Sequence, residues 1–415
     1  MKDIASMSSQ KIELSVVDTT GGLLALREEW NDLWGRSDGA HFFHSFGWCW
    51  HIWNFVAAPR GRKLHVVIGK QARRLVLIWP LMIDGRTLRM LSSDTLEYRD
   101  LIVEKSPHAN YWMTMAWNAV TSTPGVDLVL LQNLRSPSNI DQLLNGMGRT
   151  PAVVGGWCSV IRLDKYATWE SYVKQWPKSM ISDQRRQWKR AKEALPSVSF
   201  KLITDGNDIG AIIDWIIRHK VQWLRARNKS WSAENLASRE MRAFFHAASQ
   251  SAHDEGSLVL AKLSDGNIII SAGFGYRFRS DFLFHMFTYD LTWSRISPSR
   301  LFLEELVRWC FSQSIRTFDL MPGGETYKTI WANELVRTDT YAESLTLWGE
   351  YLLRWHLPLA EFVRVPEIVT TGYRYFPERL RQKIRTKLTR LNMLGLVGKI
   401  GRTCRYGTKG RNILG

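Results

Sequence analysis

Two short segments in the second half of the chain combine polar side chains with predicted helix starts, and the first covers residues 289–301. It follows an apolar run and reaches Ser297 and Pro298, where the pattern predicts that a helix begins. Free N–H groups at a helix start attract anions, and Arg295 and Arg300 add full positive charges. The segment predicts a pyrophosphate site; a capped helix with Pro at its first position is the structural alternative. The residues predicted to contact the anion are Tyr289, Ser297, Pro298, Ser299, Arg300 and Leu301.

The second segment covers residues 318–331, where a predicted strand ends, two glycines follow and a short helix begins. Tyr327 stands next to Lys328, and a neighbouring cation lowers the pKa of a phenol, so that Tyr327 could protonate a leaving thiolate. Glu325 could accept a proton from an attacking amine or hydroxyl. A structural role is the alternative for each of these residues. For Asp319, in the same segment, the structural alternative is that its carboxylate accepts hydrogen bonds from loop amides.

His285 lies in the middle of a predicted apolar strand at 281–289 that leads into the first segment. It is a candidate base, and the alternative is a buried structural histidine. The 10 histidines show no HExxH motif or paired spacing, and the 4 cysteines form no CxxC pair. We therefore predict no metal site, no disulfide framework and a reducing compartment.

Basic residues cluster in a predicted helix at 182–194, within a chain whose formal net charge is +17. Such charge attracts nucleic acid, anionic lipid or phosphate-bearing cofactors. The sequence has no zinc-finger, RNP or helix-turn-helix pattern, so nucleic acid is the weakest of these expectations. The helix is either an anion-binding wall or a solvated face. The side chains predicted to contact a substrate are Arg185, Arg186, Trp223, Asp319 and Trp331.

The elements that must position these residues alternate between helices and strands in both halves of the chain. Each half runs from helices into an antiparallel meander, then a helix and a strand, which predicts an α+β fold with mixed, mostly antiparallel sheets flanked by helices. Predicted helices lie at 23–34, 46–55, 109–121, 169–175, 182–194, 208–226, 238–252, 299–312 and 326–333. Predicted strands lie at 12–17, 64–70, 75–82, 126–131, 257–263, 268–277, 281–289 and 317–320.

The two ends of the chain bear on its location. The N-terminal residues are polar and lack the apolar core of a signal peptide, and no apolar run reaches the ~20 residues of a membrane span. A cytoplasmic protein is expected. Residues 371–415 are rich in Lys and Arg, with Leu and Ile on one predicted helical face. This basic tail either docks on the protein or contacts an anionic membrane surface, peripherally and from the cytoplasmic side.

The ordered set of these motifs resembles the CelD/BcsL-type acetyltransferases of the GNAT superfamily, which are associated with cellulose and exopolysaccharide biosynthesis. The resemblance covers roughly residues 25–335. FemAB-type transferases are similar in their tandem layout. The matching residues are Trp30 and Trp34, Phe43 to Trp48, Tyr98 to Asp100, Arg185 to Arg190, Lys220 to Leu224, Asp265-Gly266, Tyr289-Asp290, Ser297-Pro298, Phe318-Asp319 and Gly324 to Trp331.

This resemblance implies tandem GNAT-like domains: a degenerate one at 1–160, a catalytic one at 161–350, and a basic tail at 351–415. It implies acetyl-CoA or another acyl-CoA as co-substrate, with the pyrophosphate at Ser297–Leu301 and Tyr327 as the acid. Related sequences often have Gly where this chain has Ser299. The implied reaction is N- or O-acyl transfer to a small-molecule or saccharide acceptor, such as a cell-envelope or exopolysaccharide precursor. The alternatives are a FemAB-like aminoacyl-tRNA-dependent transferase and a non-catalytic scaffold of a polysaccharide synthesis system.

Overall fold

The computed structural model describes residues 11–92, 95, 97–323 and 326–356. The predicted basic tail at 371–415 lies outside the described residues, as do Gly324 and Glu325. Among the described helices, none is both long and apolar enough to cross a bilayer.

The first half begins with a strand and a set of helices, continues through short strands and ends in two helices that alternate with two longer strands. Its elements are β1 (Glu13–Val17), α2 (Thr20–Ala25), α3 (Arg27–Arg36), η1 (Phe42–His44), α4 (Phe46–Ile52), η2 (Trp53–Ala57), η3 (Ala58–Arg60), β2 (Lys63–Leu64), β3 (Val66–Gln71), β4 (Arg74–Trp79), β5 (Leu81–Asp84), β6 (Thr87–Met90), β7 (Ile102–Val103), α5 (Ala109–Thr121), β8 (Leu128–Arg135), α6 (Asn139–Gly146) and β9 (Val153–Arg162).

The second half follows the same course, with longer helices and a regular antiparallel meander. Its elements are η4 (Leu163–Lys165), α7 (Trp169–Val173), α8 (Lys178–Ala194), β10 (Ser199–Ile203), α9 (Gly206–Arg225), α10 (Ser230–Ala237), α11 (Arg239–Asp254), β11 (Leu258–Asp265), β12 (Ile268–Phe278), β13 (Asp281–Tyr289), η5 (Leu291–Ile296), α12 (Pro298–Ser312), β14 (Thr317–Pro322), α13 (Thr326–Trp331), β15 (Glu334–Ser344), α14 (Leu347–Tyr351) and η6 (Leu352–His356).

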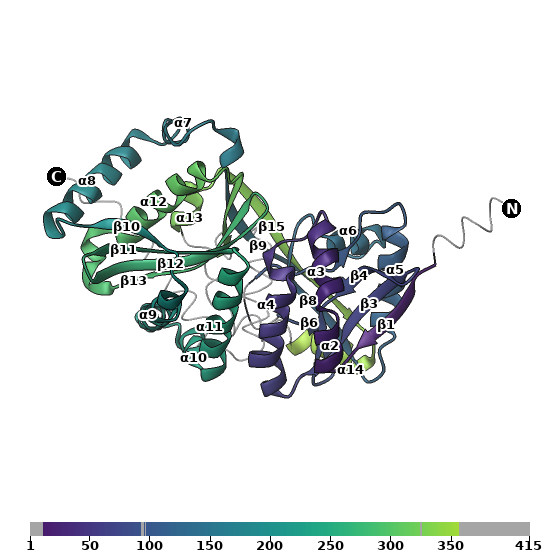
Figure 1. The fold of residues 1–415 in the computed structure, drawn as a ribbon. Helices are drawn as coiled ribbons and strands as arrows, with labels where there is room; N and C mark the ends of the chain where they lie inside the picture. The colour runs from purple at the N-terminus through teal and green to yellow at the C-terminus, as the bar shows by residue number, and fades with distance from the viewer. Residues whose placement is uncertain (1–10, 93–94, 96, 324–325, 357–415) are drawn as a thin grey trace.

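Two sheets organise the described residues. Four strands form one sheet in the order β1-β3-β4-β7, and eleven form the other in the order β10-β11-β12-β13-β14-β9-β15-β8-β6-β5-β2. The large sheet runs through both halves. In the second half, α9, α10 and α11 cover one face of the strands, and α8 and α12 cover the other (Figure 1). The α+β prediction is confirmed.

The last strand of each half pairs with the other half. Strand β9 lies antiparallel to β14, and β15 lies antiparallel to β8. The strands β9 and β15 also pair with each other. Because each half completes the sheet of the other, the halves cannot part without breaking three strand ladders. The predicted boundary between residues 160 and 161 lies within β9.

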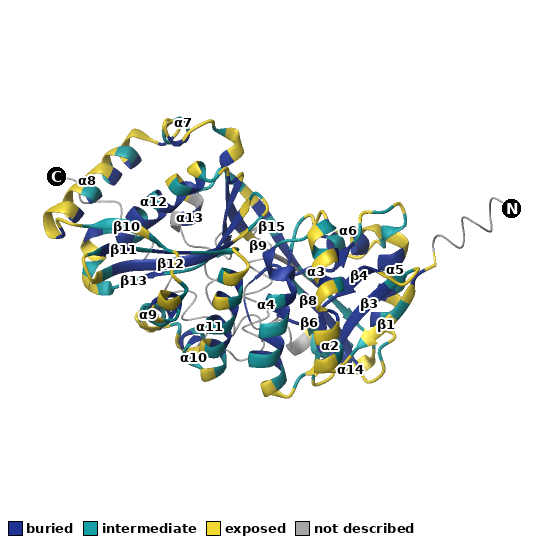
Figure 2. Ribbon diagram, in the orientation of Figure 1, coloured by how far each residue is buried: buried dark blue, intermediate teal, exposed yellow. Residues whose placement is uncertain are grey.

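Three apolar clusters hold the layers together. One packs α4, α9 and α11 against the sheet and joins both halves, a second lies under α8 and α12, and the third lies between β8 and α5 in the first half. In Figure 2 the strands are mostly buried, whereas the outer sides of α7 and α8 are exposed. The tryptophans Trp30, Trp48, Trp79, Trp112 and Trp331 are fully buried and contribute to these clusters or pack beside them.

Candidate active site

A fork between two parallel strands lies near the middle of the large sheet. Strands β13 and β14 pair only where both begin, with Asp281 opposite Thr317, Phe282 opposite Phe318 and Leu283 opposite Asp319. Beyond these residues β13 continues to Tyr289 and β14 to Pro322 without further pairing to each other. Strands that part in this way leave backbone N–H and C=O groups without a ladder partner, so the fork can bind a ligand through its backbone.

A β-bulge places His285 beside this fork. On β12, Phe274 is opposite Met286 and Gly275 is opposite Phe284, so His285 is the extra residue of β13. A bulge leaves its extra residue unpaired in the ladder and changes the direction of the side chain. Gly275 permits the close approach, because a Cβ there would lie 2.6 Å from the ring of Phe282 and would also collide with the carbonyl oxygen of Leu283.

The side chain of His285 forms a buried pair with Glu97 of the first half. Its Nε2 lies 2.6 Å from Oε1 of Glu97, and the two side chains are 8% and 2% exposed. The other polar atom of each, His285 Nδ1 and Glu97 Oε2, is buried without a hydrogen-bond partner in the described structure. Aromatic rings enclose the imidazole with centroids 5.5–5.7 Å away: Phe43, Trp48, Phe245, Phe274 and Tyr276.

The next residue, Tyr98, reaches the other strand of the fork. Its hydroxyl donates to Oδ1 of Asp319 at 2.7 Å, and Oδ1 also accepts from the amide of Met321 at 2.7 Å. Arg135 Nε lies 3.3 Å from Asp319 Oδ2. Burial raises the pKa of the Asp319 carboxyl, while Arg135 acts in the opposite direction. Asp319 therefore accepts an amide of its own strand, β14, and not a loop amide as the structural alternative expected. Glu97 and Tyr98 connect the first half to both strands of the fork.

The predicted anion site lies at the start of α12. Ser297 takes the left-handed conformation, with φ 54°, and Pro298 is the first helical residue. The amide of Arg300 donates to the carbonyl oxygen of Ser297 at 3.0 Å, and its guanidinium lies 3.9 Å from Asp183 on α8. Leu301 is buried, whereas Ser299 and Tyr289 are partly exposed.

A groove of about 590 Å³ runs between α8 and η5, next to this helix start. Its lining includes Arg190 and Glu193 from α8 and Arg295 from η5. Two arginines on facing elements give the groove a positive lining and suit it to a phosphate-bearing ligand. Arg185 and Arg186 are exposed on α8 outside this lining, and Arg186 pairs with Asp183.

The remaining predicted residues lie at separate places. Lys328 is buried, and its Nζ donates to the carbonyl oxygens of Pro322 at 3.1 Å and Met321 at 3.4 Å. Trp331 packs against Trp176, with ring centroids 4.7 Å apart, in the cluster under α12. Trp223 is half-buried on α9. Cations lie over its ring at 3.8–5.0 Å, namely Lys220, Arg227 and Lys229.

The described residues include His285, Lys328 and Asp319 near the fork but not all of the second predicted segment. Glu325 lies outside the described residues, and so does the side chain of Tyr327, whose backbone belongs to α13. Within the described ranges, no group of three or more His, Cys, Asp or Glu is placed to hold a metal ion.

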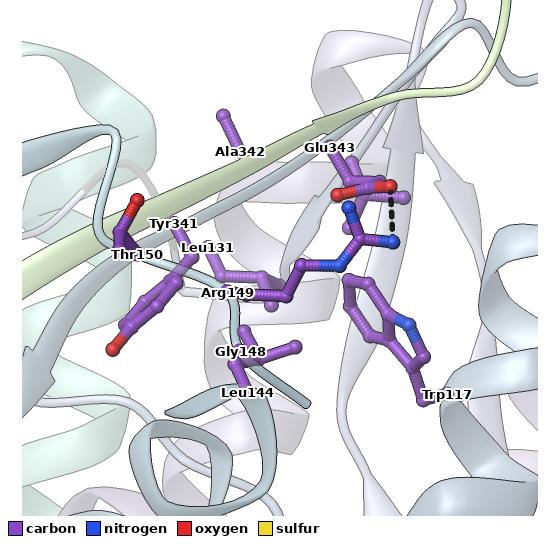
Figure 3. A pocket seen from close by; sticks show the side chains of 10 residues that line it. Trp117, Leu131, Leu144, Gly148, Arg149, Thr150, Tyr341, Ala342 and Glu343 are labelled. Atoms are coloured by element: carbon purple, nitrogen blue, oxygen red, sulfur yellow. Dashed lines mark ion pairs between the residues drawn. The ribbon is translucent and has the colours of Figure 1, made fainter. Parts of the chain in front are cut away.

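A second cavity, of about 270 Å³, lies in the first half and contains none of the predicted site residues. Figure 3 shows Trp117, Leu131 and Leu144 around it, with Arg149 directed toward Glu343. This ion pair measures 2.9 Å.

Comparison with known proteins agrees with the geometry of the second half. Residues 178–329 match the family model of the acetyltransferase (GNAT) domain. The match includes β13, β14, the bulge at His285 and the start of α12. A GNAT acetyltransferase domain is typical of an acyltransferase that uses acyl-CoA.

Solved structures share the fold across both halves. FemX is similar with a TM-score of 0.54 and 8% identity, over 82% of this chain and 99% of that chain. The C-terminal domain of a protein described as a lysylphosphatidylglycerol synthetase from Agrobacterium fabrum is similar with a TM-score of 0.52 and 10% identity, over 82% of this chain and 97% of that chain. No curated protein matches the chain.

Sequence reasoning did not find Glu97 and Arg135. Both belong to the first half, whereas the predicted chemistry came from the second half. The resemblance at Tyr98 to Asp100 was the available signal, because it marked polar residues next to Glu97 in a segment with no helix or strand pattern.

Proposed function

We propose that the protein transfers an acyl group, most simply acetyl, from acyl-CoA to an amine or hydroxyl. The observation that supports this proposal is the fork between β13 and β14 with its bulge at His285, inside the segment that matches the GNAT domain. Unpaired backbone N–H groups at such a fork polarise a thioester carbonyl, and the protein contributes mainly by positioning the two substrates.

The groove between α8 and η5 is the proposed site of the CoA phosphates. Arg190 and Arg295 line it, and the start of α12 at Pro298 lies beside it. The contacts proposed for the pyrophosphate remain those at Ser297–Leu301. Tyr327 remains the proposed acid for the thiolate.

The proposed acceptor is a saccharide or another cell-envelope or exopolysaccharide precursor, as the CelD/BcsL resemblance implies. The basic tail at 371–415 is proposed to hold the protein against the anionic cytoplasmic face of a membrane. Binding of the full chain and of a chain ending at residue 356 to vesicles with and without anionic lipid tests this part of the proposal.

Calorimetry with acetyl-CoA tests the proposed donor. A double variant, Arg190→Glu with Arg295→Glu, should lower the affinity at least ~100-fold, because hydrogen bonds to charged groups contribute ~1.5–3 kcal/mol each. Arg242→Glu on α11, which pairs with Asp214 on the opposite face of the sheet, is the matched control. Absence of binding by the folded wild type, or equal affinity in the double variant, would refute the proposal.

Aminoacyl transfer from a charged tRNA is the second candidate. The likeness to FemX over 99% of that chain and the net charge of +17 favour it. Filter binding with tRNA at physiological salt, with the salt dependence measured, separates the two donors. Tight binding of tRNA without binding of acetyl-CoA would establish the second candidate, and binding of neither would leave a scaffold role.

A further inference from the structure

We propose that Glu97 and His285 form the proton-accepting pair for the acceptor, so that each half of the chain supplies one member of the active site. The inference rests on the proposed acyl transfer. It adds Glu97, a residue of the first half, to the active site that the second half otherwise provides.

The hydrogen bond between the two side chains determines which nitrogen is the base. An ionised carboxylate only accepts hydrogen bonds, so the short contact from Nε2 to Glu97 Oε1, at 2.6 Å, places the imidazole proton on Nε2. The lone pair is then on Nδ1, which is buried and has no partner in the described structure. In this arrangement Glu97 orients His285 with Nδ1 as its free acceptor atom, as a general base requires.

A purely structural role explains these contacts poorly. A carboxylate and an imidazole buried in an aromatic enclosure lose their hydration, so the pair stabilises a fold only when its remaining polar atoms are also satisfied. Here Glu97 Oε2, His285 Nδ1 and the indole Nε1 of Trp48 are all buried without partners among the described residues. Because buried polar atoms are nearly always hydrogen-bonded, three such atoms around one imidazole indicate a place for a ligand.

The same atoms indicate the class of acceptor. Two acceptor atoms and one indole donor suit an uncharged hydroxyl or amine, and the surrounding rings suit an apolar face such as that of a sugar. Of the titratable side chains that face the imidazole, Glu97 comes from the first half and Tyr276 from β12. The facing rings of Phe43, Trp48 and Phe245 carry no charge.

In the transfer, His285 Nδ1 takes the proton of the attacking hydroxyl or amine while its oxygen or nitrogen bonds to the thioester carbonyl carbon. The tetrahedral intermediate then breaks its C–S bond, and the thiolate leaves with the electron pair. Tyr327, the proposed acid, protonates the thiolate and regains its proton from solvent, while the imidazolium, stabilised by the Glu97 carboxylate, releases its proton to solvent. The products are the acylated acceptor, free CoA thiol and neutral imidazole.

Hydroxylamine is the probe acceptor, and release of CoA thiol from acetyl-CoA is the measured rate, corrected for the uncatalysed reaction. His285→Gln keeps a donor toward Glu97 but has no lone pair in place of Nδ1, and it should lower kcat ~10²–10⁴-fold. Glu97→Gln keeps the acceptor but loses the charge, and it should lower kcat at least ~10-fold. Its KM for hydroxylamine should stay near that of the wild type, a split between kcat and KM that a merely structural role would not produce.

The controls are Glu304→Gln and His65→Gln, which alter a buried glutamate and a buried histidine outside the pair. Both should leave kcat within about twofold of wild type, and thermal unfolding reports whether each variant is folded. His285→Asn replaces His285→Gln if the latter does not fold. The dissociation constant for acetyl-CoA should be unchanged in the pair variants.

The two proposals are refuted by different results. Absence of acetyl-CoA binding by the wild type overturns the proposed function and this inference with it. Binding of acetyl-CoA together with unchanged kcat in folded His285→Gln and Glu97→Gln overturns the inference alone. Binding of acetyl-CoA without turnover of hydroxylamine in the wild type also overturns the inference.

Discussion

Replacing Tyr98 by Phe removes the hydroxyl through which the first half contacts β14. That hydroxyl donates to the buried carboxylate of Asp319 at 2.7 Å. Removing a hydrogen bond to a buried charged group costs ~1.5–3 kcal/mol, because the acceptor stays buried but loses its donor. Asp319 retains the amide of Met321 and the guanidinium of Arg135, so the expected loss in unfolding free energy is about 2 kcal/mol rather than the larger cost of an isolated charge.

The chain offers a matched control for this variant. Tyr172 is also buried, and its hydroxyl donates to the carbonyl oxygen of Trp331 at 2.6 Å. Since that acceptor is neutral, Tyr172→Phe should cost only ~0.5–1.5 kcal/mol. Denaturant unfolding of both variants, and a double-mutant cycle of Tyr98→Phe with Asp319→Asn, measure the difference. A cost for Tyr98→Phe no greater than for Tyr172→Phe, or no coupling in the cycle, would refute the argument.

Three further variants test the bulge, a buried carboxyl and the start of α12. Gly275→Ala should lower the unfolding free energy by ~1–3 kcal/mol because its Cβ meets the ring of Phe282, whereas Gly146→Ala, with open space around it, should have little effect in the same denaturant assay. Burial raises the pKa of Asp100 to about 7, above the ~3.9 of an unfolded aspartate. The stability that the protonated Asp100 contributes is thus present below pH ~4 and is lost as pH rises through 7. The unfolding free energy of the wild type should therefore fall by up to about 4 kcal/mol over this range relative to that of Asp100→Asn. Parallel pH profiles of unfolding free energy for the two proteins would contradict this. Ser297→Gly relieves a left-handed residue and should raise the unfolding free energy by ~1 kcal/mol in thermal or denaturant unfolding; a decrease would show that the serine side chain stabilises the turn.

Local patterns were enough to predict much of the second half. An Asp-Gly pair between two predicted strands is typical of a hairpin turn, and Asp265-Gly266 joins β11 to β12, with the positive φ at Gly266, 55°, that such a turn requires. Pro298 was expected at the start of a helix, and α12 begins there. These features depend on residues close together in the sequence, so they could be predicted before any tertiary contact was known.

The strands at the centre of the large sheet were not predicted. Strand β9 contains Gly155 and Gly156, which have no side chains to continue an alternating pattern and so weaken the strand signal. Strand β15 contains Arg337 and Asp339, which form an ion pair at 2.7 Å with Asp339 fully buried. Polar residues hid the strand pattern, because their burial depends on pairing across the two halves.

The sequence by itself determined the α+β class, the meander that contains His285, the helix start at Pro298 and the positive charge around it. Only the tertiary structure placed Glu97 next to His285, and the two lie 188 positions apart. The physical reason is that two side chains interact only when folding buries them together and brings them within contact distance. Here the exchange of β9 and β15 between the halves does both. No periodicity or local motif carries that information.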